Sequence, residues 1–520
     1  MTLGLRRLGA AATLFLVAAG PASAVDPAAI KQDIDAIIGH WRRLAQSDPG
    51  VQIRGDAVVR EQAGEVVATL PEVQVQGPDG SFALRPVTLR IKDAGPDTMD
   101  VRVELPPRFD VLGPDGKPQV SLVLGSQNLV GVWRKSIRTF ETADMTVDKL
   151  SLIDPGQKPL AEIARLSFTG GVKESAPGVW SGAYKFAIEG TKVAAPDGTS
   201  VAVGSVFYDF ILKDARLAEL APLMDNAGLG LTGATVWNPE GLTLPQWQTL
   251  LAAVERMPGL VGGISIVYGA TDIHVASPMM GPEPLLRADG AAFGFGVAGD
   301  GARGTSLSIG LDVKRVRGPS SLPFEVPTAA IPHSFDLRLE LDQLPTGAVW
   351  EAFFGATRQN LERPPGNRPG ARALSPPEIV ERAFQAAVAM TAPRAMETFS
   401  QARPQLHIRN LAIAFPEGRI DAVGTVRFAP EAPQMATGTI ELKLSGIDDL
   451  IEKLGRNPKS DQEAIGVIGL TFLRGLGKPT PGPGGKPIYV VQIQVADDGR
   501  VLANGIDAMK MFELLEKRRR

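Results

Sequence analysis

Two spacings of apolar residues alternate along the chain, and each predicts a different backbone. The stretch TGTIELKLSGIDDLIEKLG (residues 437–455) begins with apolar side chains at every second position and continues with apolar side chains three and four residues apart. The first spacing is that of a strand with one solvated face, and the second is that of a helix with one apolar stripe. Residues 334–353 repeat this strand-then-helix order. Since an amphipathic strand needs a covered apolar face, we expect the helix that follows to fold back over it.

Strand patterns dominate most of the remaining sequence. Alternating apolar residues between positions 73 and 105 are interrupted by the turn sequences GPDG at 77–80 and AGPD at 94–97. Proline sets the φ angle that such turns need, and glycine tolerates a positive φ at the exit. Short strands at regular intervals are typical of an antiparallel meander. The sequence therefore predicts an α+β, β-rich fold in which curved antiparallel sheets are covered by amphipathic helices, in two sheet-plus-helix units.

Helical spacing recurs at several places between the strands. It predicts helices at about residues 26–48, 215–224, 244–257, 346–354, 377–399 and 506–520. The first carries an apolar stripe that includes Ile30, Ile34 and Ile38, which favours a helix docked on a sheet. A helix lying on a membrane surface is the alternative, but Asp33 and Asp35 on the polar face depart from the usual basic face.

A change of composition divides the chain near residue 358. Residues 358–377 are rich in proline, glycine and arginine and contain almost nothing apolar. That composition is typical of a linker. We therefore place the clearest domain boundary there, between a β-rich region with covering helices at residues 25–357 and an α+β unit at residues 378–520.

The N-terminus has the three parts of a secretory signal peptide. Arg6 and Arg7 are followed by an apolar run at residues 8–19 and by the small residues Ala22-Ser23-Ala24. We expect cleavage after Ala24 and a periplasmic location, with an uncleaved N-terminal anchor as the alternative. No later segment has 18 unbroken apolar residues, so the sequence predicts no transmembrane segment after cleavage.

Composition narrows the possible chemistry further. The chain has no cysteine, so disulfides, thiol catalysis and cysteine–metal sites are excluded. Its net charge of −3 becomes −5 on cleavage, because two arginines and no acids are removed. A chain without a strong positive field is a poor partner for nucleic acid, and we predict no such partner.

No catalytic, metal or cofactor motif stands out. None of the four histidines (His40, His274, His333 and His407) has a second histidine at ligand spacing. His407 lies in the alternating sequence QLHIRNL, where we interpret it as a strand-face residue. Glycines spaced as in dinucleotide-binding loops occur at 228–233 and 294–299, but neither run lies between a strand and a helix. We therefore predict a protein that is not an enzyme and has no catalytic, cofactor-binding or metal-binding residues.

The C-terminal region also resembles a known family. The motifs GTIELKLSGIDDL and VQIQVADDGRVLANG combine alternating strands with a short helix and an Asn-Gly turn. From about residue 400 onward the chain resembles the proteobacterial "domain of unknown function 2125" family and, more distantly, AsmA-like envelope proteins. The nearer family implies no catalytic residues. The distant relatives imply lipid handling in the cell envelope, although they typically carry a membrane anchor.

Three functions remain open at this point. The first is a groove for a lipid or similar hydrophobe, lined by the candidate apolar-face residues Leu442, Leu444, Val491 and Ile493. Against it stands a sealed core made of the same residues. The second is a structural or interaction protein that binds an envelope partner through strand edges. The third, a hydrolase of envelope glycans or lipids, lacks a nucleophile or an acid–base pair. The basic tail at residues 517–520 could contact anionic lipid, or it could merely complement a helix dipole.

Overall fold

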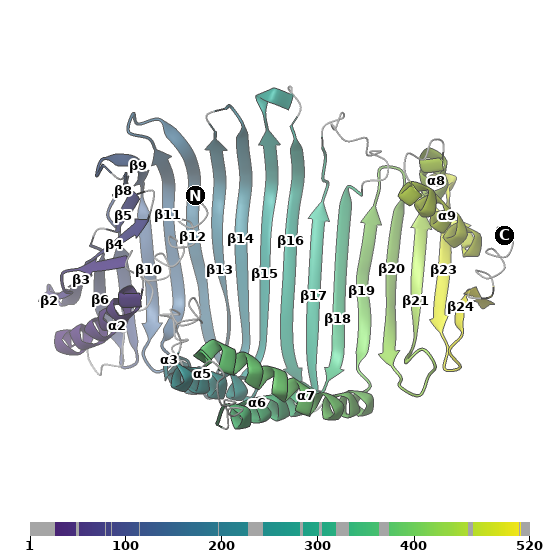
Figure 1. Cartoon of the computed structure of the whole chain (residues 1–520). Helices are drawn as coiled ribbons and strands as arrows, with labels where there is room; N and C mark the ends of the chain where they lie inside the picture. The colour runs from purple at the N-terminus through teal and green to yellow at the C-terminus, as the bar shows by residue number, and fades with distance from the viewer. Residues whose placement is uncertain are drawn as a thin grey trace. The chain divides into compact units, whose positions relative to one another are not determined.

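The computed structural model confirms a β-rich protein (Figure 1). It describes residues 26–47, 51–77, 80–84, 86–113, 115–195, 197–226, 243–280, 284–300, 304–318, 332–362, 374–455, 461–508 and 510. Within these residues the strand pairings are antiparallel, as the turn sequences predict. The predicted signal peptide, the glycine run at 228–233 and the basic tail lie outside the described residues.

The chain divides into two compact units, each built from three segments. Unit 1 comprises Met1–Ala195, Phe207–Ile264 and Trp350–Ala392, and unit 2 comprises Pro196–Val206, Ser265–Val349 and Pro393–Arg520. Strands β14 (Ser200–Ala215) and β15 (Val261–Ala276) each contribute residues to both units. The two consecutive sheet-plus-helix units expected from the sequence are therefore not confirmed.

Unit 1 begins with helix α2 and thirteen strands among its described residues. The strands are β1 (Val51–Arg54), β2 (Val58–Gln62), β3 (Glu65–Thr69), β4 (Glu72–Gly77), β5 (Gly80–Leu84), β6 (Thr88–Gly95), β7 (Thr98–Glu104), β8 (Arg108–Leu112), β9 (Pro118–Val123), β10 (Gln127–Arg134), β11 (Thr139–Ile153), β12 (Pro159–Ala176) and β13 (Val179–Ala194). Strands β10 to β13 form a meander, in which each strand pairs with the next. The long strands β11 to β13 were not predicted from the sequence.

Helix α2 (Pro27–Ser47) docks on this sheet. The Asp26 carboxylate caps it by accepting a hydrogen bond from the backbone N–H of Ala28 at 2.9 Å. Ile30, Ile34 and Ile38 are at most 2% exposed and belong to the largest core cluster of the unit. The helix expected to dock on a sheet does so, with Ile30, Ile34 and Ile38 buried against it.

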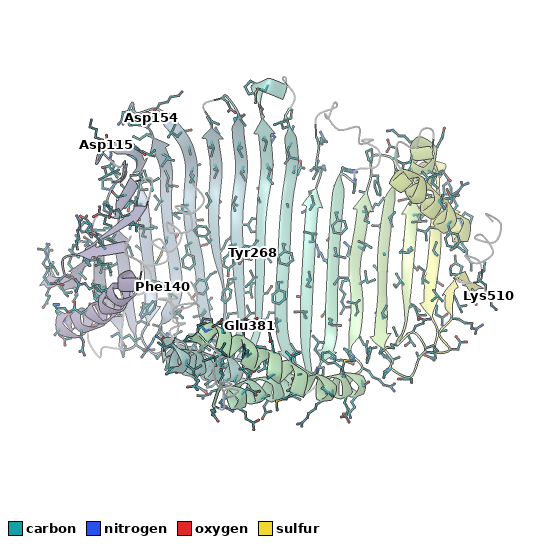
Figure 2. The ribbon with its side chains drawn as sticks, in the orientation of Figure 1. Asp115, Phe140, Asp154, Tyr268, Glu381 and Lys510 are labelled. Atoms are coloured by element: carbon teal, nitrogen blue, oxygen red, sulfur yellow. The ribbon has the colours of Figure 1, made fainter. Side chains whose placement is uncertain are left out.

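Two aromatic residues lie at the centre of the same core. Trp133 on β10 is 2% exposed and meets Phe140 of β11 edge to face, with ring centroids 5.0 Å apart. Phe140 is labelled in Figure 2. The Tyr184 hydroxyl donates a hydrogen bond to the Phe140 carbonyl at 2.5 Å. Burial raises the pKa of Tyr184 above its ordinary value. This part of unit 1 is therefore a closed core.

Helices α3, α5, α6 and α7 follow the predicted pattern with one correction. They span Leu217–Asn226, Leu244–Arg256, Thr346–Glu362 and Pro376–Ala402. Helix α6 continues to Glu362 instead of ending near residue 354, because Thr357 and Leu361 extend its buried side. Residues 358–362 and 376–377 of the predicted linker are thus helical. Residues 363–373 lie outside the described residues, so the domain boundary placed there stays a prediction.

Unit 2 contains a second and longer meander. Its strands and helices are β16 (Leu286–Asp300), β17 (Gly304–Lys314), β18 (Ser334–Leu344), β19 (Gln405–Ala414), β20 (Arg419–Phe428), β21 (Ala436–Ser445), α8 (Ile447–Gly455), α9 (Asp461–Leu476), β22 (Lys478–Pro481), β23 (Pro487–Val495), β24 (Val501–Ala503) and β25 (Ile506–Asp507). Strands β16 to β21 pair in chain order, and β23 then pairs with β21. The strands expected at 405–415, 419–428 and 437–444 are confirmed.

The Asn-Gly turn near the C-terminus closes a hairpin. Asn504 and Gly505 both have positive φ, 50° and 85°, and they connect β24 to β25. Ile506 therefore continues a strand, so the helix predicted to start there is wrong at its beginning. An Asn-Gly pair suits this two-residue connection because both of its positions need positive φ.

The Asn504 side chain also ties helix α9 to the sheet. Its Nδ2 donates to the carbonyls of Leu476 and Val490, at 2.7 and 3.1 Å, and its Oδ1 accepts from the backbone N–H of Gln492 at 3.0 Å. The Leu476 carbonyl is the last of α9, where helical partners run out.

We expect Asn504→Ala to destabilise unit 2 by about 3 kcal/mol, through the lost hydrogen bonds and the strain of alanine at positive φ. Asn504→Gly loses the same bonds without the strain and should cost about 2 kcal/mol. Urea unfolding of the two variants measures both contributions. A neutral Asn504→Gly would show that the side-chain bonds do not stabilise the unit.

Candidate functional site

Strand pairing arranges the apolar residues of unit 2 in rows across the sheet. Directly opposite residues of antiparallel strands project from the same face. Two adjacent rows cross seven strands, from β16 to β23. They are Phe293, Leu311, Leu337, Leu411, Ala422, Leu442 and Val491, and Phe295, Ile309, Leu339, Ile408, Gly424, Ile440 and Ile493.

Two flanking rows have the same character. They are Ala291, Val313, Phe335, Ile413, Ile420, Leu444 and Tyr489, and Val297, Leu307, Leu341, Leu406, Val426, Gly438 and Val495. We call these four rows the apolar face. None of their residues is charged, and seven strands at the usual spacing span about 29 Å.

One end of the apolar face is sealed by helices. Leu444 on β21 and Val491 on β23 are fully buried beneath Ile447 and Leu450 of α8, and Leu442 and Ile493 pack partly buried against the same cluster. Figure 1 shows α8 and α9 beside these strands. The structure thus brings together the four candidate residues predicted from the sequence, and at Leu444 and Val491 it places them in a closed core.

Ion pairs hold helix α8 over this core. Its first turn carries Asp448 and Asp449, which pair with Arg474 at 2.7 Å and with Lys486 at 2.5 Å. The Tyr489 hydroxyl donates to Asp448 at 2.9 Å. The hydrogen bond from Lys486 to Asp449 raises the pKa of Lys486, and the hydrogen bond to Tyr489 is the main cause of the raised pKa of Arg474. Polar contacts at the rim thus keep this end closed.

The other end of the apolar face is exposed. Phe293 is 45% exposed, Phe295 38%, and Val297 and Leu311 37% each. Large apolar side chains gathered on one surface of a folded protein mark an interaction site more often than scattered ones do. Figure 2 shows the side chains that project along β16 and β17.

These exposed residues were not predicted as site residues, although the sequence carries a signal for them. In AAFGFGVAG the larger apolar residues alternate with Gly294, Gly296 and Ala298. The glycines are spaced as in a dinucleotide-binding loop, but the structure places them inside strand β16. The same alternation puts the small residues on one face and Phe293, Phe295 and Val297 on the other.

The opposite face of unit 2 carries polar residues, including a histidine between two possible partners. His407 Nδ1 lies 3.0 Å from Thr425 Oγ1, and His407 Nε2 lies 3.2 Å from Asp342 Oδ2. A carboxylate, an imidazole and a hydroxyl in this order resemble a hydrolase triad. However, β19 and β20 are interior strands whose backbone N–H groups pair with their neighbours. Thr425 itself is paired on both sides, with His407 and with Thr439, so it lies within the ladder and not at a free strand end. The arrangement acts as a cross-strand hydrogen-bond set, with His407 on a strand face.

Other candidate sites remain unsupported in the part of the chain that the structure describes. No group of three or more His, Cys, Asp or Glu residues there could hold a metal ion. Within the same residues, no helix has the length and hydrophobicity needed to cross a bilayer.

Comparison with known families covers this whole site. The family described as "Uncharacterized protein conserved in bacteria (DUF2125)" matches residues 241–508. The chain belongs to this family. The DUF2125 match includes every residue of the apolar face, and it starts well upstream of residue 400, where the resemblance in the sequence begins. No curated protein and no solved structure matches the chain.

Proposed function

We propose that the protein is exported and holds the acyl chain of a lipid, or a similar hydrophobe, against the exposed end of the apolar face. The observation that supports this function is the set of four uncharged rows whose members on β16 and β17 include the exposed Phe293, Phe295, Val297 and Leu311. A face of this kind is stabilised when apolar surface leaves water. The distant resemblance to AsmA-like envelope proteins favours the same function.

An acyl chain fits the apolar face better than a protein partner does. Protein interfaces carry about one hydrogen bond per 100–200 Å² and a polar rim. In the four rows the Tyr489 hydroxyl is the one polar side-chain group, and it already donates to Asp448. A polar group of a protein partner pressed against these rows would lose water without gaining a hydrogen bond. Hydrocarbon has no such groups to satisfy.

The dimensions and energies are suitable for such a ligand. On β16 the apolar column from Ala291 to Val297 covers six residue steps, about 20 Å at the usual rise of a strand. Each methylene that leaves water contributes about 0.8 kcal/mol. Partial burial of one chain along β16 and β17 would therefore give useful affinity.

Binding of the uncharged dye N-phenyl-1-naphthylamine to the purified protein tests the function by fluorescence. We expect the double variant Phe293→Ser and Phe295→Ser to lose at least about tenfold in dye affinity, since it removes two large apolar contacts. Thermal unfolding should change little, because both side chains are already exposed.

The matched control is Val423→Ser. Val423 is also 45% exposed, but it follows Ala422 on β20 and thus projects from the opposite face. Its dye affinity should equal that of the unsubstituted chain. The proposal fails if the double variant binds dye normally, or if lipid extraction and mass spectrometry of the exported protein find no co-purified hydrophobe. If a second protein is instead found bound to this face, the alternative function, a structural or interaction protein, is favoured.

Export is the other half of the proposal. It depends on the leader at residues 1–24, whose basic, apolar and small-residue parts are those of a cleaved signal. Fractionation and N-terminal sequencing should recover a periplasmic chain that begins at Val25. An unprocessed chain in the cell interior would contradict it.

A further inference from the structure

A group of basic residues lies beside the exposed part of the apolar face, where β16 begins and β17 ends. On β16, alternate positions continue the column of Phe293 and Ala291 to Asp289 and Arg287. Beyond the last residue of β17, Arg317 forms an isolated antiparallel bridge with Arg287, so that the two residues lie directly opposite each other. The two residues exchange backbone hydrogen bonds of 2.8 and 2.7 Å. Such a pair has Cα atoms about 5.5 Å apart.

The charges in this group do not cancel. Arg315 pairs with Asp289 at 2.5 Å, which neutralises one arginine. Both Arg287 and Arg317 are exposed, and neither has an ion pair within the described part of the chain. Like charges directly opposite each other on neighbouring strands are destabilising. An anion placed between the two guanidinium groups would reverse that effect.

A third residue nearby also lacks a partner. The backbone carbonyl of His333 accepts a hydrogen bond from the N–H of Val316 at 2.7 Å, which places His333 beside the same strand end. Its Nδ1 is buried and has no hydrogen-bond partner among the residues described. A polar group left unsatisfied next to two unpaired arginines is consistent with a missing polar ligand.

We infer that the hydrophobe bound by the apolar face is a lipid with a net negative phosphate headgroup, and that Arg287 and Arg317 bind the headgroup. This inference rests on the proposed function and adds the class of ligand and its orientation. The acyl chain would extend from Ala291 toward Val297, and the phosphate would lie at the basic end. Guanidinium groups bind phosphate oxygens with paired, charge-assisted hydrogen bonds. Along β16, the basic residues would therefore contact the headgroup of such a lipid and the apolar residues its acyl chain.

Competition against the dye distinguishes this inference from the proposed function. Short-chain phosphatidylglycerol and phosphatidylcholine with identical acyl chains are titrated separately against the dye-bound protein at low salt. We expect the anionic lipid to displace the dye at a roughly tenfold lower concentration, because it gains the charge-assisted bonds. The advantage should shrink at high salt, where exposed charges are screened.

In the double variant Arg287→Gln and Arg317→Gln, the two lipids should displace the dye at equal concentrations. The affinity of this variant for the uncharged dye should stay unchanged. The control is Arg338→Gln. Arg338 lies on β18 between Leu337 and Leu339, so its side chain projects from the face opposite the apolar face. This side chain is 67% exposed and pairs with Asp336. The control variant should keep the preference.

Each outcome has one interpretation. If the dye does not bind the unsubstituted chain, the proposed function fails. If the dye binds but both lipids compete equally, the apolar face is retained and the inference of an anionic headgroup is overturned. If the anionic preference survives in the double variant, the assignment to Arg287 and Arg317 is overturned.

Discussion

Replacement of Leu444 by aspartate is expected to unfold the sealed part of unit 2. Leu444 is fully buried on β21, opposite Tyr489 and Ile420 and within the cluster formed with Leu450 of α8. Loss of a buried leucine side chain alone costs about 2–5 kcal/mol. An aspartate there must also be buried either charged or protonated, without a polar partner, which costs more. Since domains are stable by only about 5–15 kcal/mol, much of that stability should be lost.

The matched control lies on the same strand. Thr439→Asp introduces the same charge five residues earlier, at an exposed position of the opposite face. We expect it to change the free energy of unfolding by less than about 0.5 kcal/mol, as surface substitutions usually do. Urea unfolding and limited proteolysis of both variants provide the measurement. Equal stability of the two variants would mean that Leu444 lines an open groove, in which case Leu444→Asp should instead abolish dye binding.

The sequence predicted the strands of unit 2 well and their assembly poorly. Ile440, Leu442 and Leu444 alternate with polar residues, so the face they share follows from local spacing. Their position opposite Val491 and Tyr489, in contrast, depends on strand register, because pairing joins residues that are distant in the sequence. The four rows could therefore be recognised only once the pairing was known.

The spacing of residues in the sequence also does not predict which end of the apolar face is sealed and which is exposed. Leu444 and Phe293 both lie in strands with one apolar face, yet one is fully buried and the other is 45% exposed. What separates them is the position of α8, which packs on β21. The candidate residues chosen from the sequence thus lie at the closed end of the apolar face, and the alternating residues at 293–297 lie at its exposed end.

The basic end of the apolar face illustrates a third limit. Arg287 and Arg317 are thirty residues apart, and nothing in the sequence near either one points to the other. The isolated bridge between them places two like charges side by side. A charge pair of this kind is visible only in the structure, and it is the feature from which we infer a preferred orientation of the proposed ligand.

A second large effect is expected in unit 1, at Trp133. Trp133→Ala should destabilise the unit by about 3–5 kcal/mol, because it removes a buried aromatic side chain from the core beneath α2. Its indole lies opposite Phe140 of β11 on one side and Met99 of β7 on the other, so the cavity would be lined by residues of three strands.

Trp133→Phe separates packing from polarity at the same position. The indole Nε1 of Trp133 is buried and has no hydrogen-bond partner among the described residues, and such a group costs about 1–3 kcal/mol. Phenylalanine removes that cost and keeps a ring against Phe140, so we expect a loss of no more than about 1.5 kcal/mol, typical of conservative core changes. Trp350 is the control, since its Nε1 donates to the Val254 carbonyl at 3.2 Å and Trp350→Phe leaves that carbonyl without this donor. Both substitutions remove the same side-chain volume, so denaturant unfolding should show a larger loss of stability for Trp350→Phe than for Trp133→Phe. The reverse order would mean that the Trp133 indole nitrogen is satisfied in solution, and that the polar group adds to the stability of this core.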